Sequence, residues 1–192
     1  MRRKKVIFIS GFNGNKYDAF LIKLFLRKRF KIIYFNHNMS FGKIKIERFA
    51  KQLKKFIDKL KLEKGEKISI IALSVGGLIA EYYLKFIDNK KVDKLITLCS
   101  PFKGSPLASI FFKERKGMRE IQKHSTFLKK LNKKKLKRVK QESIYCEEDF
   151  VVPGKSGKYS KSKKSFFFIH IIIHFWPPTI FEIKRFLEKW NK

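Results

Sequence analysis

The sequence predicts an α/β protein built on one mostly parallel sheet of six strands, with helices on both faces. Short apolar runs alternate along the chain with longer amphipathic runs, as expected where each strand is followed by a helix. The short runs are apolar at successive positions, which is typical of strands buried on both faces. A length of 192 residues favours a single domain over 1–192.

The first half of the chain predicts three strand–helix units. Its strands are short runs of consecutive apolar residues, at 6–9, 31–35 and 68–73. Its helices have apolar residues three or four positions apart, over 17–29, 43–62 and 75–87. Right-handed crossovers then bring the carboxyl ends of all three strands to one edge of the sheet, where such folds place their chemistry.

The second half is less regular. A strand is predicted at 92–98, and the very basic segment 101–140 has short helices near 105–113 and 119–131, which we interpret as a small cap. The remaining expectations are two strands, a loop and a closing helix that begins near a proline. They cover 143–146 and 166–173 for the strands, 153–165 for the loop and 178–189 for the helix.

The composition bounds the class of protein. Hydrophobic residues make up 44% and aromatic residues 15%, which excludes an intrinsically disordered chain. Lys and Arg total 47 against 16 Asp and Glu, for a formal charge of +31. The basic residues are spread along the whole chain, so we interpret them first as a solvated, compositionally biased surface. The alternative is that they bind an anionic partner. A membrane surface is then favoured as the partner, and nucleic acid is not expected.

Other features set expectations about cofactors and location. Cys99 and Cys146 lie in apolar stretches and indicate buried free thiols rather than a disulfide framework. No His/Cys spacing indicates a zinc site, and no cofactor is expected. The apolar run at the N-terminus is too short for a signal peptide, and no window reaches the length of a membrane-spanning helix. We therefore expect a cytoplasmic protein, with peripheral membrane contact as the alternative; the oligomeric state is not predicted.

Ser74 is the candidate nucleophile. It lies between the strand 68–73 and the following helix, in the run Ala72-Leu73-Ser74-Val75-Gly76. A sharp strand-to-helix turn of this kind needs small residues two positions before and two after the serine, and it exposes the hydroxyl. The N–H of Val75 then lies at a helix N-terminus, where it can stabilise an oxyanion.

A serine nucleophile needs a base, and the base needs an orienting acid. Asp149 is the predicted acid, because it follows a strand and precedes a Val-Val-Pro run; Glu147 and Glu148 are the alternatives. His174 is the predicted base, because it is late in the chain and ends the strand predicted at 166–173. His170 is the alternative, which we interpret as a packed residue within that strand.

The first strand supplies the second oxyanion donor. It ends in the glycine-containing run 10–14, whose predicted place beside the third strand directs the N–H of Phe12 toward Ser74. Gly11 allows the close backbone approach that this requires.

Several segments in the same order resemble the alpha/beta-hydrolase superfamily, in particular its lipase-like branch of small lipases and esterases. They also resemble hydrolases of the GPI inositol-deacylase type. The resemblance is carried by the runs VIFISGFNG, ALSVGGLIAEYYL, LITLCSPFKGSPLA, MREIQKHSTFLKKLN, EDFVVP and HFWPPTIFEIKRFL. Three positions depart from the family pattern, with Ser10, Leu73 and Phe102 standing where histidine is common.

The resemblance implies ester hydrolysis through an acyl-enzyme on Ser74. His174 takes the serine proton, Asp149 orients the imidazole, and the N–H groups of Phe12 and Val75 hold the oxyanion. The implied substrate is a small-molecule or lipid ester. The alternatives are an acyltransferase or thioesterase that uses the same triad, and a non-catalytic hydrolase-fold protein that binds anionic membranes or nucleic acid.

Overall fold

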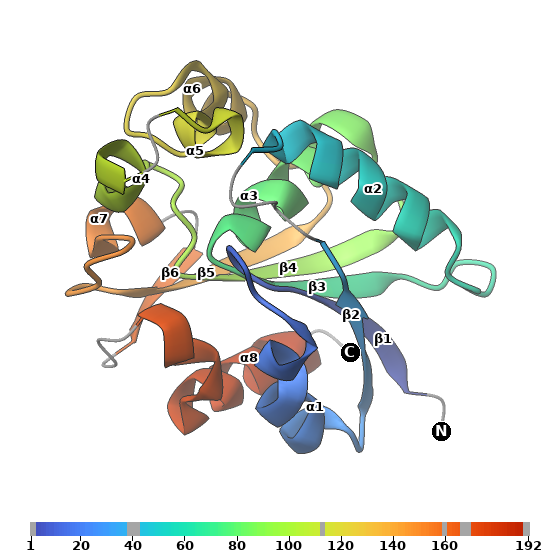
Figure 1. Cartoon of the computed structure of the whole chain (residues 1–192). Coiled ribbons are helices and arrows are strands. Elements are labelled where there is room, and N and C mark those ends of the chain that lie inside the picture. The colour runs from blue at the N-terminus through green and yellow to red at the C-terminus, as the bar shows by residue number, and fades with distance from the viewer. Residues whose placement is uncertain (1–2, 38–42, 112–113, 159–160, 166–169, 190–192) are drawn as a thin grey trace.

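The computed structural model describes residues 3–37, 43–111, 114–158, 161–165 and 170–189. Its centre is a six-stranded sheet in the order β2-β1-β3-β4-β5-β6, with every neighbouring pair parallel (Figure 1). The strands are β1 (Lys4–Ile9), β2 (Phe30–Phe35), β3 (Ile68–Leu73), β4 (Val92–Leu98), β5 (Lys140–Cys146) and β6 (Lys161–Ser165). The predicted fold class is confirmed.

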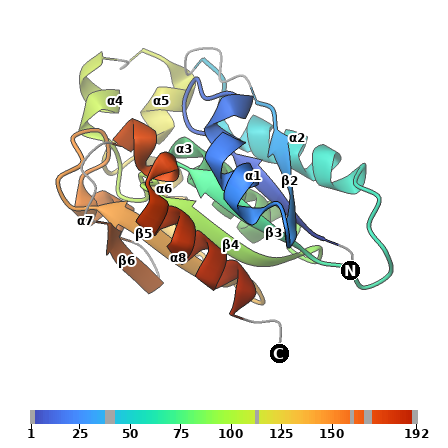
Figure 2. The ribbon, with the colours of Figure 1, turned by 90° about the horizontal axis from the view of Figure 1, so that it is seen from below.

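The helices cover both faces of this sheet (Figures 1 and 2). Below the sheet in Figure 1 lie α1 (Phe20–Leu26) and α8 (Pro177–Glu188), together with the 3-10 segments η1 (Lys16–Ala19) and η4 (His170–Phe175). Above it lie α2 (Ile46–Asp58), α3 (Val75–Tyr82) with its π-helical extension η3 (Tyr83–Ile87), α4 (Pro106–Phe111), α5 (Lys116–Glu120), α6 (Thr126–Lys133) and α7 (Gly154–Gly157).

Side chains at alternate positions of the central strands pack into two separate hydrophobic cores, one on each face of the sheet. In β1, Ile7 and Ile9 pack with α2 and α3, whereas Val6 and Phe8 pack with α1 and α8. Side chains of a strand alternate between its two faces, so a strand covered on both sides must be apolar at every position. This requirement explains the continuous apolar runs of the sequence.

The segment between β4 and β5 forms the short helices α4, α5 and α6 on the α2 side of the sheet. Its apolar side chains Met118, Ile121, Leu128 and Leu131 are buried in the same core as α2 and α3. None of the helices in the described ranges combines the length and the apolar composition needed to cross a membrane.

The last strand differs from its prediction. A strand was expected over 166–173, but residues 170–173 belong to the 3-10 segment η4, and 166–169 lie outside the described residues. The sixth strand is Lys161–Ser165, within the segment predicted to be a loop. It pairs with β5 alone, at the edge of the sheet. An edge strand tolerates polar and charged residues, so an apolar pattern does not reveal it.

Candidate active site

Ser74 occupies a strained turn between β3 and α3. Its backbone has φ 52° and ψ −125°, a conformation that non-glycine residues rarely adopt and that is often found at functional sites. The turn is tight: a Cβ at Gly76 would lie 2.5 Å from the carbonyl oxygen of Ser10 and 2.7 Å from that of Ile9. The missing side chain at position 76 therefore lets α3 start directly against the end of β1.

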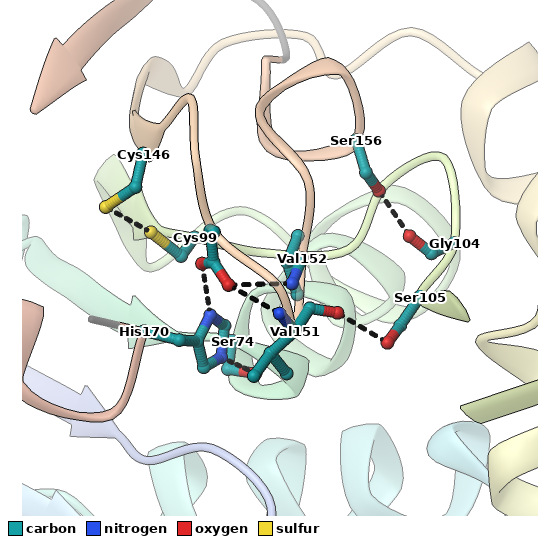
Figure 3. Close-up of polar contacts among 10 residues, drawn as sticks. Ser74, Cys99, Gly104, Ser105, Cys146, Val151, Val152, Ser156 and His170 are labelled. Atoms are coloured by element: carbon teal, nitrogen blue, oxygen red, sulfur yellow. Dashed lines mark hydrogen bonds and ion pairs between the residues drawn. The ribbon is translucent and has the colours of Figure 1, made fainter. Parts of the chain in front are cut away.

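The Ser74 hydroxyl is hydrogen-bonded to a histidine that is in turn bonded to a carboxylate. His170 Nε2 lies 2.9 Å from Ser74 Oγ, and His170 Nδ1 lies 2.6 Å from Asp149 Oδ2 (Figure 3). The three residues come from the turn after β3, the start of η4 and the turn after β5. All three segments follow the carboxyl ends of parallel strands and so meet at one edge of the sheet.

Asp149 is held as an acceptor by its own turn. Its Oδ1 accepts hydrogen bonds from the backbone N–H groups of Val151 (2.8 Å) and Val152 (2.9 Å). The other oxygen, Oδ2, is left for the imidazole. The side chain is fully buried, and a buried carboxylate with donors on both oxygens has a fixed orientation. The sequence prediction of Asp149 agrees with this placement, whereas the alternatives Glu147 and Glu148 are exposed.

The acid turn is also tied to the segment after β4. Ser105 Oγ donates to the carbonyl of Val151 at 2.6 Å, and Ser156 Oγ donates to the carbonyl of Gly104 at 2.6 Å (Figure 3). The backbone N–H of Lys103 donates to the same Ser156 hydroxyl at 3.1 Å. Two neighbouring loops thus brace each other behind the carboxylate.

These contacts define where the protons lie. Because the Asp149 carboxylate only accepts, the hydrogen between it and His170 belongs to Nδ1. In the neutral imidazole Nε2 then carries a lone pair, which accepts the hydroxyl proton of Ser74. This is the tautomer that a general base needs in order to activate a serine.

His174 does not take the place that the sequence prediction gave it, and His170, the alternative, does. His174 is 2% exposed, and neither of its ring nitrogens has a hydrogen-bond partner among the described residues. Its ring centroid lies 4.0 Å from that of Phe175. Burial, reinforced by the nearby His170, lowers the pKa of His174 to about 4. The choice of histidine was wrong because the last strand was predicted too late in the sequence. β6 ends at Ser165, so the histidine that reaches Ser74 is four residues earlier than the predicted one.

The segments that carry the two predicted oxyanion donors lie beside Ser74. Val75 is the first residue of α3, where backbone N–H groups lack partners within the helix. Phe12 follows Gly11, at which an added Cβ would lie 3.0 Å from Ser74 Cβ and 3.5 Å from Ser74 Oγ. The loop after β1 therefore passes directly against the serine, as expected from the order of the strands.

The comparison with protein families agrees with this geometry. The model of the lecithin:cholesterol acyltransferase family matches residues 40–175, which is more than half of the chain. The chain belongs to the lecithin:cholesterol acyltransferase family. The matched segment contains Ser74, Asp149, His170 and His174.

Solved structures share the fold of this family member at low sequence identity. A metagenomic carboxyl esterase, MGS0156, has a TM-score of 0.76 at 13% identity, over 97% of this chain and 76% of its own. The lin2722 gene product of Listeria innocua has a TM-score of 0.72 at 16% identity, over 100% of this chain and 96% of its own. The mature lipase BlEst2 of Bacillus licheniformis has a TM-score of 0.71 at 14% identity, over 95% of this chain and 91% of its own.

At such identities these structures establish the fold, and the family match establishes the family. No curated protein matches the sequence. Family and fold together confirm that the chain is a lipase- and esterase-like enzyme of the alpha/beta-hydrolase superfamily, as the sequence predicts.

One group of side chains in this acyltransferase-family protein also has the donor types of a metal site. Ligand atoms of Cys99, Asp149 and His170 lie within 4.8 Å of one another. Cys99 Sγ lies 3.3 Å from Cys146 Sγ, and both cysteines are buried and free. The contact with Cys146 and burial raise the pKa of the Cys99 thiol, which disfavours the thiolate that a metal would need. Asp149 and His170 are already hydrogen-bonded to each other, and this contact accounts for the group without a metal ion.

Proposed function

We propose that this protein is a serine hydrolase that cleaves carboxylic esters through an acyl-enzyme on Ser74, with His170 as the base and Asp149 as the orienting acid. The observation that carries the proposal is the continuous hydrogen-bond chain from Ser74 Oγ through the imidazole to a buried carboxylate, at 2.9 Å and 2.6 Å. A hydroxyl activated in this way is a nucleophile toward acyl groups.

In the first half-reaction the Ser74 oxygen attacks the ester carbonyl while its proton moves to His170 Nε2. The imidazolium that forms is stabilised by Asp149, and the N–H groups of Phe12 and Val75 donate to the oxyanion. When the tetrahedral intermediate collapses, the C–O bond to the alcohol breaks, and His170 returns the proton to the departing alkoxide. In the second half-reaction His170 takes a proton from water, whose oxygen attacks the acyl carbonyl. The bond from the acyl carbon to Ser74 Oγ then breaks, His170 returns the proton to Ser74 Oγ, and the carboxylic acid is released.

A second candidate function is acyl transfer, and the family match favours it, because the family is named for an acyltransferase. The same acyl-enzyme yields a new ester when an alcohol replaces water in the second half-reaction. A thioester could also supply the acyl group. Turnover of one acyl ester with and without an added long-chain alcohol, with the products separated by mass, distinguishes hydrolysis from transfer. Parallel assays with the matching acyl thioester identify a thioesterase.

Lipid esters are the substrate class that we infer, with the enzyme acting at the periphery of an anionic membrane. Phe150, the residue after Asp149, is 88% exposed, and Trp176, just after η4, is 37% exposed. Phe150 lies on the turn that carries Asp149, and Trp176 directly follows the segment that carries His170. A net charge of +31 attracts the anionic headgroups of a bilayer, in whose interface exposed aromatic side chains are stabilised.

A serine-reactive fluorophosphonate tests the proposal directly. We expect it to label the protein on Ser74, with the modified residue mapped by mass spectrometry. Ser74→Ala should lose both labelling and the turnover of p-nitrophenyl esters, whereas Ser109→Ala, a serine on α4, should keep both. Turnover that survives Ser74→Ala would remove Ser74 from the mechanism. A folded wild type that has no turnover, but binds anionic vesicles with steep salt dependence, would support a non-catalytic binding protein instead.

A further inference from the structure

The loop that carries the N–H of Phe12 is held by two polar side chains from the neighbouring strand β2 and the residues after it. Ser10, the first residue of this loop, is fully buried. Its hydroxyl lies 2.9 Å from the phenol oxygen of Tyr34, and its carbonyl lies 3.0 Å from Nε2 of His37. Tyr34 OH also donates to the carbonyl of Gly14 at 3.2 Å. These contacts fix the loop at both ends, two residues on either side of Phe12.

Each proton in this arrangement can be assigned. The single phenol hydrogen of Tyr34 goes to Gly14, whose carbonyl can only accept, so the Ser10 hydroxyl donates to the Tyr34 oxygen. The Ser10 carbonyl likewise requires that His37 carry its hydrogen on Nε2. His37 Nδ1 is buried without a hydrogen-bond partner among the described residues, and burial lowers the pKa of this histidine. A neutral Nε2–H tautomer satisfies both conditions.

The two side chains reach the loop from opposite faces of the sheet. Tyr34 stacks on Phe8 at a centroid distance of 6.4 Å, and Phe8 belongs to the core under α1 and α8. The ring of His37 packs against Phe49 of α2 at 5.7 Å, on the other face. Each anchor is thus itself fixed by packing, which is the condition for a side chain to set the orientation of its partner.

The contacts around this loop restrict rotation of the peptide group that carries the Phe12 N–H. The Ser10 carbonyl that accepts from His37 also lies against the start of α3, where a Cβ at Gly76 would come within 2.5 Å of it. The backbone N–H of Gly14 donates to the carbonyl of Gly11 at 3.2 Å, closing a turn over Phe12. The direction of the Phe12 N–H therefore depends on how firmly residues 10 and 14 are held.

We propose that Tyr34 and His37 are positioning residues that aim the Phe12 N–H at the oxyanion of the Ser74 reaction. This inference rests on the proposed function, because it assumes that an oxyanion forms beside Ser74. Neither side chain need touch the substrate. Their effect falls on the transition state, where the charge on the carbonyl oxygen develops, more than on substrate binding.

Tyr34→Phe tests the first anchor, because it removes one oxygen and keeps the ring that stacks on Phe8. We expect kcat for a short p-nitrophenyl ester to fall about 10- to 100-fold with little change in KM, as for a misplaced catalytic group. Tyr83→Phe is the matched control, since the buried Tyr83 hydroxyl has no hydrogen-bond partner among the described residues. It should leave kcat unchanged. An unchanged kcat in Tyr34→Phe, or an equal loss in Tyr83→Phe, would overturn the proposal.

His37 is tested by a pair of substitutions. In His37→Gln the side-chain amide can still donate to the Ser10 carbonyl, whereas His37→Leu fills similar space without a donor. The glutamine variant should retain most of the wild-type kcat, and the leucine variant should lose about as much as Tyr34→Phe. Equal activity of the two folded variants would contradict a role for the hydrogen bond.

Amide hydrogen exchange over residues 10–14 provides a readout that does not need turnover. We expect faster exchange of this loop in Tyr34→Phe and His37→Leu than in the wild type, with exchange in α8 unchanged. Unaltered exchange in the loop would overturn the anchoring itself. If the wild type neither hydrolyses esters nor reacts with a fluorophosphonate, the proposed function fails, and the exchange comparison still decides whether the two residues anchor the loop.

Discussion

His170 and His174 belong to the same 3-10 segment, η4, but their imidazole rings have different surroundings. His170 is hydrogen-bonded to Ser74 and Asp149, whereas His174 is buried with both nitrogens unpartnered among the described residues. A 3-10 helix has about three residues per turn, so a step of four residues rotates a side chain by roughly 120°. One helix of this kind cannot aim both rings at the same serine.

Substitution of each histidine in turn should separate their roles. His170→Ala removes the proposed base, so we expect kcat for a p-nitrophenyl ester to fall by about 10³-fold or more. His174→Phe keeps a ring in the apolar site and should leave kcat within about threefold of the wild type, well short of the loss expected for a triad member. Steady-state kinetics on the two variants, with folding checked by circular dichroism, decide between them. A large loss in His174→Phe with an active His170→Ala would restore His174 as the base.

The buried His174 should make the fold sensitive to acid. Its pKa is about 4 in the folded protein, against 6.5 for an exposed histidine. The unfolded chain therefore binds more protons in this interval, and the stability present above pH 6.5 is lost as the pH falls toward 4, by up to about 3 kcal/mol. Denaturant unfolding at pH 7 and pH 4.5 measures it. His174→Phe should reduce this acid loss, and an unchanged pH dependence would show that His174 does not cause it.

Asp149→Asn should remove activity without unfolding the turn. The asparagine oxygen can still accept from the N–H groups of Val151 and Val152, but the amide nitrogen must donate to His170 Nδ1. That places the imidazole hydrogen on Nε2, facing Ser74, and we expect kcat to fall about 10⁴-fold near neutral pH. Asp149→Ala should in addition lose about 1–3 kcal/mol, because two N–H groups lose their acceptor. Steady-state kinetics measure the loss of activity in both variants, and urea unfolding compares their stabilities. Equal stabilities of Asp149→Asn and Asp149→Ala would contradict the role of Asp149 as the acceptor of these two N–H groups.

The sequence was sufficient, for physical reasons, to predict the sheet and to single out two of the three residues that the structure joins by hydrogen bonds, Ser74 and Asp149. Strands covered on both faces are largely apolar, and five of the strands contain a short apolar run by which the sequence reveals them. Ser74 could be identified because the tight turn into α3 requires small neighbours. Asp149 could be chosen over its neighbours Glu147 and Glu148 because acids are scarce in this chain and Val151, Val152 and Pro153 set its register.

The histidine that is hydrogen-bonded to Ser74 could not be identified from the same pattern. The apolar residues near His170 resemble a strand more closely than the polar run Lys161–Ser165 does, and position in the chain alone favours the histidine that ends that apolar run. The polar strand is instead held by ion pairs: Lys163 pairs with Glu142 on β5 and with Glu182 on α8. Such pairing depends on three distant segments and is not apparent from local periodicity. The anchors Tyr34 and His37 were missed for the same reason.

A buried ion pair links α3 to the segment between β4 and β5. Lys85 Nζ lies 2.8 Å from Glu81 Oε2 and donates to the carbonyl of Leu131 in α6 at 3.1 Å, and the Gln141 side chain donates to Glu81 Oε1. Both charged groups are almost completely buried, and burial raises the pKa of Glu81. Removing one partner leaves the other charge without compensation in an apolar interior, which is strongly destabilising.

Lys85→Met should therefore lower the free energy of unfolding by about 3–5 kcal/mol at pH 8. The loss should be smaller at pH 5. The folded pKa of Glu81 lies above its unfolded pKa, so protonation of this carboxyl at low pH favours the folded state and removes the unpaired charge. This contribution is lost as the pH rises through the folded pKa. In the double variant Glu81→Gln, Lys85→Met, no buried charge remains, and the new amide carbonyl at position 81 can still accept from Gln141. Its stability should recover most of the loss and be nearly the same at both pH values. Urea unfolding measures all three proteins, and a double variant no more stable than Lys85→Met would show that the unpaired carboxylate is not the cause.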